Sequence, residues 1–166
     1  MTLRIELSKK NATQEEREAI LTPLRAYNAS KAGATVSEQI ALLLRNDSDE
    51  ILGGLYGRVF LPVVFFIELL SVPEQAWGQG MGSKLMQMAE DLAREKECIG
   101  IWLDTFDFQA PEFYKKHGYS ELGHIADYPP GHKRFFFSRS VWWICNLRFS
   151  GCHQKIAACG VVVQFF

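Results

Sequence analysis

The sequence lacks the features that mark membrane and secreted proteins. The longest strongly apolar run, residues 59–67, is interrupted by Pro62 and is much shorter than the roughly 20 residues that a membrane-spanning helix requires. The first residues include Arg4 and Glu6, where a signal peptide keeps its apolar region. We therefore expect a soluble, cytoplasmic protein that has no membrane partner.

A large excess of one charge is missing as well. The chain carries 18 basic and 19 acidic residues, so its composition provides no basic field that would attract nucleic acid. Its four cysteines form no Cys-x-x-Cys pair. The late group Cys145, Cys152, His153 and Cys159 matches none of the usual zinc spacings. We expect neither a nucleic-acid partner nor a metal ion.

What is present is enough chain for one folded domain with a short appendage. At 166 residues the chain can bury a sizeable core without a disulfide or a metal. Every acidic residue lies at or before Asp127, whereas residues 139–166 hold three basic residues and three of the four cysteines. We predict a domain over residues 1–138 and a separate apolar and basic tail over residues 139–166. An exposed tail of this kind favours packing on the domain or on a second copy, so a homodimer is one expectation.

The pattern of apolar residues predicts both strands and helices. A capping box at Thr13–Glu16 begins a helix that Pro23 should break or kink. A second helix follows Gly82 and has one apolar face, and a short third helix runs from Pro111 to Gly118. Strands are predicted at 3–7, 38–44, 51–60, 63–72, 99–105, 119–126 and 133–138. This order predicts an α/β fold with a mixed, mostly antiparallel central sheet flanked by helices.

A glycine-rich loop follows the predicted strand at residues 63–72. Gly78, Gly80 and Gly82 allow backbone conformations with positive φ and a close approach to a ligand. The helix that starts there directs unpaired N–H groups and its positive dipole end at the loop, which makes the loop an anion site that suits phosphate. The alternative is a glycine-rich turn with an ordinary helix cap. The P-loop pattern is absent, and the mid-chain position after a hairpin argues against a dinucleotide fold.

The loop resembles the acetyl-CoA site of the GNAT N-acetyltransferases, in which a strand, a loop of pattern Gln/Arg-x-x-Gly-x-Gly/Ala and a helix hold the pyrophosphate of coenzyme A. Residues 80–85, Gly-Met-Gly-Ser-Lys-Leu, fit the loop and helix start. Residues 110–119, Ala-x-x-Phe-Tyr-x-x-x-Gly-Tyr, resemble the family's later helix. The resemblance covers residues 3–138. It implies a GNAT-like sheet, with the loop between a central strand and the following helix, and acetyl-CoA as co-substrate.

The resemblance also assigns cofactor contacts. Trp77 stands where the family has Gln or Arg, unless the register of the loop begins at Gln75 instead. Asp107 stands where the family commonly has Asn, and Gln109 is a substitute for that amide. The remaining predicted contacts lie at the end of the strand and in the loop: Leu70, Ser71, Val72, Gly78, Gln79, Gly80, Met81, Gly82 and Ser83.

Two side chains are candidates for proton transfer. Glu68 is the only charge within residues 63–72, and burial on a central strand would suit it to act as a general base. The alternative is a carboxylate that faces a wet groove or pairs with Arg58 across the hairpin. Tyr114 is the candidate general acid that protonates the leaving thiolate, or else it fills the core. Its neighbour Phe113 is expected to face the core.

These residues predict an acetyltransferase that acts by direct attack of a primary amine on acetyl-CoA in a ternary complex. A backbone N–H near Leu70 or Ser71 would hold the oxyanion. Asp104 and Asp107 are candidates for holding a small cationic amine, and no acyl-cysteine intermediate is expected at Cys98. The alternative is a non-catalytic acyl-CoA-binding or interaction protein with the same fold.

Overall fold

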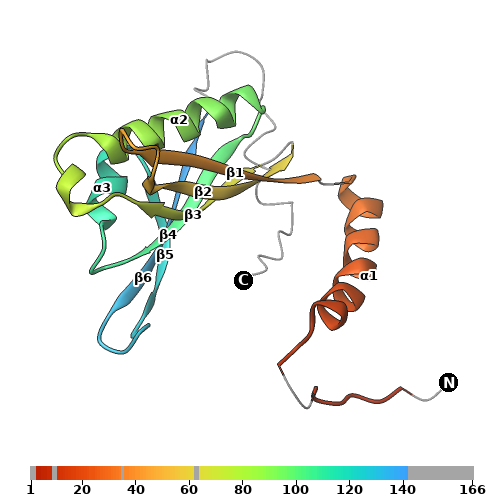
Figure 1. Cartoon of the computed structure of the whole chain (residues 1–166). Coiled ribbons are helices and arrows are strands. Elements are labelled where there is room, and N and C mark those ends of the chain that lie inside the picture. Colours follow the sequence, from red (N-terminus) through yellow and green to blue (C-terminus); the bar gives the residue numbers. More distant parts are fainter. Residues whose placement is uncertain (1–2, 9–10, 35, 62–63, 142–166) are drawn as a thin grey trace, which may run out of the picture.

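The structure, a computed structural model of the chain, describes residues 3–8, 11–34, 36–61 and 64–141 (Figure 1). Its elements are α1 (Gln14–Ala32), β1 (Val36–Arg45), β2 (Ile51–Leu61), β3 (Val64–Ser71), the 3-10 helix η1 (Glu74–Ala76), α2 (Met81–Glu95), β4 (Gly100–Phe106), α3 (Pro111–Lys116), β5 (Ser120–Ala126) and β6 (Lys133–Ser140). The strands form one sheet in the order β1-β2-β3-β4-β6-β5, in which only β3 and β4 are parallel neighbours. The predicted mixed, mostly antiparallel sheet is confirmed.

The turn between β1 and β2 has the predicted polar chemistry. Asn46 Oδ1 accepts hydrogen bonds from the backbone N–H groups of Ser48, at 3.0 Å, and Glu50, at 2.9 Å. Asp49 has a φ of +64°, a conformation that a short polar residue tolerates better than most. The turn sets the antiparallel register of β1 on β2, and β2 and β3 pair in the same sense, as predicted for a hairpin.

The core lies between the sheet and α2, which packs along one face of the sheet (Figure 1). From α2, Leu85, Met86, Ala89 and Ala93 are buried. Met88 has the helical spacing of an apolar face with Leu85 and Ala89, yet it is 53% exposed, because the buried stripe runs through Met86 instead. The sheet contributes fully buried side chains that include Leu55, Val59, Phe65, Ile101, Leu103 and Phe137. Each large apolar side chain buried in this way contributes roughly 1.5–3 kcal/mol to folding.

The N-terminal part of the chain differs from the prediction in two ways. Residues 3–7 do not form a strand: Leu3, Ile5 and Leu7 are exposed and have no strand partner, and alternation alone does not make a strand. Pro23 does not break the helix, which is continuous over α1. Because α1 buries no residue and stands apart from the sheet in Figure 1, water can bind the carbonyl group that Pro23 leaves without an N–H partner.

The last strand continues past its predicted end. β6 runs to Ser140 rather than Ser138, and Val141 is 3% exposed. Arg139 Nη1 donates to Glu90 Oε1 of α2 at 2.5 Å. The division of the chain into residues 1–138 and 139–166 stays a prediction, and the tail from residue 142 onward lies outside the described residues.

Candidate active site

Strands β3 and β4 pair along only half of their length. They pair from Val64 opposite Gly100 to Ile67 opposite Leu103, yet β3 continues to Ser71 and β4 to Phe106. Beyond Ile67, β3 remains paired with β2 on its other side. Successive residues of a strand direct their N–H groups to opposite sides. Some N–H and C=O groups between residues 68 and 71 therefore have no strand partner on the side of β4. We call the place beyond Ile67 and Leu103, where the two strands no longer pair, the cleft; its unpaired groups suit the predicted contacts at Leu70 and Ser71.

Glu68 lies at the point where this cleft begins. Ile67 is opposite Gly57 and Leu69 is opposite Tyr56, so Glu68 is the extra residue of a β-bulge. A bulge bends its strand and changes the direction of a side chain, and bulges are frequent beside active sites. Nothing in the residues of β3 alone marks this irregularity.

The Glu68 carboxylate forms a bidentate ion pair with Arg58 of β2. Its Oε1 lies 2.5 Å from Arg58 Nε, and its Oε2 lies 3.1 Å from Arg58 Nη2. The hydrogen bond to Glu68 raises the pKa of the Arg58 guanidinium. Both side chains are about three-quarters buried, with exposed fractions of 26% for Arg58 and 21% for Glu68. Of the alternatives for Glu68, the pairing across the hairpin is thus present, and it fixes the orientation of the carboxylate.

The loop after β3 is closed by its own side chains. Trp77 Nε1 donates to the carbonyl oxygen of Val72 at 2.8 Å, and Gln79 Nε2 donates to that of Gln75 at 2.7 Å. Gly78 and Gly80 have φ values of +74° and +75°, which most other residues would adopt only with strain. The indole of Trp77 therefore links the loop back to the end of β3. Trp77 occupies the position where the resemblance expects Gln or Arg.

The start of α2 leaves an anion site open. Its N-cap is Gly80, which has no capping side chain, and its first turn contains no acidic residue. The first helical hydrogen bond runs from Lys84 N to Gly80 O at 3.0 Å. The N–H groups of Met81, Gly82 and Ser83 therefore have no partner within the helix. This geometry favours the phosphate-binding interpretation over an ordinary cap, and its donors suit the pyrophosphate of coenzyme A.

Helix α3 packs against this end of α2. A Cβ atom added at Gly82 would lie 3.3 Å from Phe113 Cζ, so the glycine permits the close approach. Tyr114 is 8% exposed and belongs to the core. Phe113 is half-buried and packs against the same core, as expected. Burial, aided by the negative charge of Asp104, raises the pKa of Tyr114 to about 12. The hydroxyl therefore keeps its proton throughout the neutral range.

The polar residues after β4 bind their own chain. Gln109 Oε1 accepts from Phe106 N at 2.9 Å and from Thr105 Oγ1 at 3.0 Å. Asp107 Oδ1 lies 3.0 Å from His132 Nδ1, and its Oδ2 accepts from Lys133 N at 3.0 Å.

Asp104, the other carboxylate considered for an amine, lies 2.6 Å from Arg134 Nη2. Each of the carboxylates that were candidates for holding a cationic amine therefore already has a partner.

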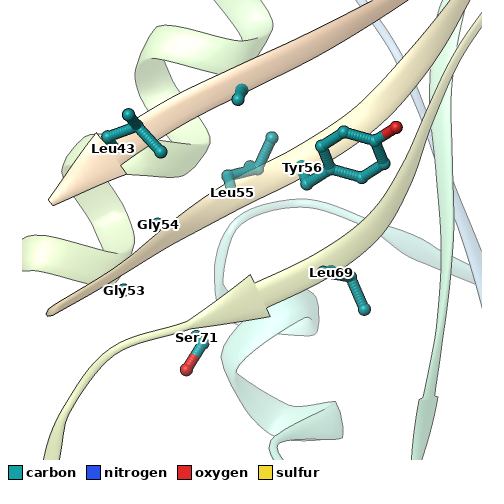
Figure 2. A pocket seen from close by; sticks show the side chains of 8 residues that line it. Leu43, Gly53, Gly54, Leu55, Tyr56, Leu69 and Ser71 are labelled. Carbon is teal, nitrogen blue, oxygen red and sulfur yellow. The ribbon is translucent and has the colours of Figure 1, made fainter. Parts of the chain in front are cut away.

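A shallow apolar pocket of about 220 Å³ opens on β1, β2 and β3. Figure 2 shows the residues that line it, among them Leu43 of β1, Tyr56 of β2 and Leu69 of β3. Both Gly53 and Gly54 are required for strand pairing, because an added Cβ would overlap Ser71 O at Gly53 and Leu42 O at Gly54. The pocket reaches the predicted cofactor residues only at Ser71, and no sequence pattern predicts it.

The fold and this geometry agree with the comparisons to known proteins. The profile described as the Acetyltransferase (GNAT) family matches residues 8–119. The chain belongs to the GNAT acetyltransferase family. It is an acetyltransferase that uses acetyl-CoA as its co-substrate.

Individual relatives cover most of the chain. The Blasticidin-S acetyltransferase of Streptomyces morookaense is 38% identical over 128 residues, which are 76% of this chain and 92% of the relative. A crystal structure of an acetyltransferase from Bacillus cereus is 38% identical, with a TM-score of 0.72 over 81% of this chain and 97% of that one. An aminoglycoside 6'-N-acetyltransferase complexed with coenzyme A shares the fold at 17% identity, with a TM-score of 0.57 over 64% of this chain and 74% of that one.

Two further features of the described residues concern membranes and metals. No helix among them is long and apolar enough to cross a membrane. Within the same part of the chain, no group of three or more His, Cys, Asp or Glu side chains is arranged to hold a metal ion. The cysteine and histidine group of the tail, considered above for zinc, lies outside the described residues.

Proposed function

We propose that this GNAT acetyltransferase transfers the acetyl group to a primary amine of a small acceptor, by direct attack in a ternary complex. The observation that carries the proposal is the bulge at Glu68, which puts a carboxylate on β3 at the residue where the pairing with β4 has just ended. The glycine loop lies at the end of the same strand, so one end of the sheet can present both the thioester and the group that receives a proton. A small acceptor is in keeping with relatives named for blasticidin S and for aminoglycosides.

Glu68 acts as the general base in this proposal. It takes a proton from the acceptor ammonium, directly or through water, so that the neutral amine can attack the acetyl carbonyl. The ion pair with Arg58 holds the carboxylate in one orientation before the acceptor arrives. Backbone N–H groups of residues 68–71 that face the cleft stabilise the negative charge that develops on the carbonyl oxygen.

Tyr114 supplies the proton for the departing sulfur. As the new nitrogen–carbon bond forms and the carbon–sulfur bond breaks, the thiolate takes the phenolic proton, and the tyrosinate regains a proton from solvent. Because the pKa of Tyr114 is raised to about 12, the acid is fully protonated at physiological pH. No side-chain nucleophile is required. Burial raises the pKa of the Cys98 thiol, and the residue is inaccessible, so an acyl-cysteine route has no support.

One experiment tests the proposal. The purified protein is mixed with acetyl-CoA and, in turn, with aminoglycosides, polyamines, nucleosides that carry an amine, and peptides with a free amino terminus. Thiol release is followed alongside the mass of the acceptor. We expect one amine class to release one thiol for each acetyl group gained.

Two outcomes would contradict the proposal. Binding of acetyl-CoA without acceptor-dependent thiol release from any of these amines would favour a non-catalytic acyl-CoA-binding protein. Thiol release together with O-acetylation of the acceptor would make the nucleophile a hydroxyl and not an amine.

A further inference from the structure

His117 connects the end of α3 to the start of α2. It is the residue after the last helical position of α3, and its ring is half-buried. His117 Nδ1 lies 2.8 Å from the carbonyl oxygen of Phe113, and His117 Nε2 lies 3.0 Å from Ser83 Oγ. The Phe113 ring packs against the imidazole, with 4.2 Å between ring centroids. The two segments that resemble the acetyl-CoA site are therefore joined by one side-chain contact.

The chemistry of the two partners determines the direction of these bonds in the neutral ring. A carbonyl oxygen can only accept, so His117 Nδ1 carries the hydrogen that bonds to Phe113 O. His117 Nε2 is then an acceptor, and Ser83 donates its hydroxyl hydrogen to it. In this state the Ser83 hydroxyl has no hydrogen left for a ligand.

A proton on His117 reverses the second bond. Both ring nitrogens of an imidazolium are donors, so Nε2–H donates to Ser83 Oγ and the Ser83 hydroxyl hydrogen is released. Ser83 is the third residue of α2, beside the unpaired N–H groups of Met81 and Gly82. The released hydroxyl therefore becomes a further donor at the anion site, and the imidazolium adds a positive charge behind it.

We propose that His117 is a positioning residue that couples acetyl-CoA binding to proton uptake by turning the Ser83 hydroxyl from the imidazole to the pyrophosphate. The inference rests on the proposed placement of the pyrophosphate at the start of α2. Imidazole is the side chain that changes charge between pH 5 and pH 8, and this sets the range over which the coupling is tested. By linkage, a proton that favours the cofactor is itself bound more tightly when the cofactor is present.

None of the charged side chains described around His117 forms a hydrogen bond with the Ser83 hydroxyl as His117 does. From β6, Arg139 Nη1 donates to the His117 carbonyl oxygen, and the same nitrogen is paired with Glu90 of α2. On the adjoining turns, Lys84 follows Ser83 and Lys116 precedes His117, and both are exposed lysines. Among the described residues, no carboxylate is paired with the His117 ring, whereas His132 and His124 each contact one.

The test measures cofactor affinity and proton uptake by titration calorimetry. The 3′-phosphate of coenzyme A titrates near pH 6 and would obscure the result, so the probe is 3′-dephospho-coenzyme A, with acetyl-CoA in parallel. Each titration is performed at pH 6.0 and pH 8.0, in two buffers that differ in ionisation enthalpy. The variants are His117→Gln, which keeps a polar group without titrating, and Ser83→Ala. His124→Gln on β5 is the matched control.

We expect the unaltered protein and His124→Gln to bind the probe about five- to tenfold more tightly at pH 6.0 than at pH 8.0, with uptake of a fraction of a proton. In His117→Gln the affinity should be the same at both pH values. In Ser83→Ala the difference between the two pH values should shrink to less than half, because only the charge of the imidazolium remains. A slope that persists in His117→Gln, or an unaltered protein without a slope, would overturn the coupling while leaving the acetyl-CoA site in place. If Gly80→Val at the loop left acetyl-CoA binding unchanged, the proposed site itself would be wrong and the inference would fall with it.

Discussion

Glu68 is paired with Arg58 across the β2–β3 hairpin, so its carboxylate could serve catalysis or only the stability of the hairpin. Substitutions of the two residues distinguish these roles. Glu68→Gln keeps a side chain of the same shape but cannot accept a proton from the acceptor. We expect kcat to fall about 100-fold or more, within the range for general bases, and the acidic limb of the pH–rate profile to disappear. Steady-state kinetics between pH 5.5 and pH 9 measure both effects.

Two further variants serve as controls for the effect of Glu68→Gln on kcat. Glu121→Gln removes a carboxylate that contacts His124 on β5, away from the cleft, and should leave kcat unchanged. Arg58→Gln breaks the same ion pair as Glu68→Gln but leaves the proposed base. If Arg58→Gln and Glu68→Gln reduced kcat equally and both kept the acidic limb, Glu68 would serve only to hold the hairpin together.

The Tyr114 hydroxyl is proposed to act on the leaving group, so its removal should affect turnover more than binding. We expect Tyr114→Phe to lower kcat by about tenfold to 100-fold, while the Kd for acetyl-CoA changes by no more than a few-fold. Stopped-flow thiol release and calorimetry measure the two quantities. An unchanged kcat would assign Tyr114 to the core alone, where its ring already packs against Phe137.

Burial of Tyr114 also predicts how stability depends on alkaline pH. Its pKa is about 12 in the fold against about 10 in an unfolded chain, so its contribution is fully present below pH 10 and is lost as pH rises toward 12. For this residue the loss between pH 9 and pH 11 is about 1 kcal/mol. Urea unfolding should show Tyr114→Phe losing less stability over that interval than the unaltered protein. Tyr27→Phe, on exposed α1, is the control and should lose as much as the unaltered protein.

At the scale of elements, strong local patterns predicted the structure well. The capping box at Thr13 forms as expected, with Thr13 N donating to Glu16 Oε2 at 2.8 Å and Glu16 N donating to Thr13 Oγ1 at 3.1 Å. The two hairpin strands and the helix after the glycine loop also lie where predicted. The strand at 3–7 failed because a strand exists only with a hydrogen-bonding neighbour, and alternation in one segment says nothing about its neighbour.

The features of the site that the sequence did not predict depend on how segments far apart in the chain are aligned with each other. The bulge at Glu68 results from a count mismatch between two strands, which one strand's residues do not reveal. The bond between His117 and Ser83 joins positions 34 residues apart, and nothing local marks it. The glycine loop, by contrast, was predictable because backbone conformation and helix dipole are local properties.

The glycine loop gives an element-scale prediction. Gly80→Val places a branched side chain at a φ of +75°, where the backbone must approach the pyrophosphate. We expect acetyl-CoA affinity to fall at least 30-fold, and stability to fall by about 1–2 kcal/mol from the strained conformation alone. Gly33→Val is the control for strain, because its φ is +83°, its ψ of 163° is at least as unfavourable for valine, and its added side chain also meets open space. It should show the strain without the loss of affinity. Equal affinity in both variants would place the pyrophosphate elsewhere.

At the scale of the whole molecule, a buried carboxylate joins helix α2 to the last strand of the sheet, β6. Glu90 of α2 is 2% exposed and accepts hydrogen bonds from Arg139 of β6 and from Arg94. Arg94 Nε also donates to the carbonyl oxygen of Val141, at 3.3 Å. Removing one partner of a buried pair leaves an uncompensated charge, which costs about 3–5 kcal/mol. The last described residues are therefore part of what secures α2 to the sheet.

This network predicts where the chain can be shortened. A protein that ends at Val141 keeps Arg139 and the buried Val141 side chain, whereas one that ends at Ser138 loses both. We expect the longer form to unfold cooperatively and to bind acetyl-CoA with unchanged affinity. The shorter form should lose roughly 3 kcal/mol or more of its unfolding free energy, because Glu90 is left with Arg94 alone. Urea unfolding of the two forms, beside the full chain, measures the difference. Equal stability of the two forms would return the domain boundary to residue 138. Failure of the longer form to fold would make the tail part of the core.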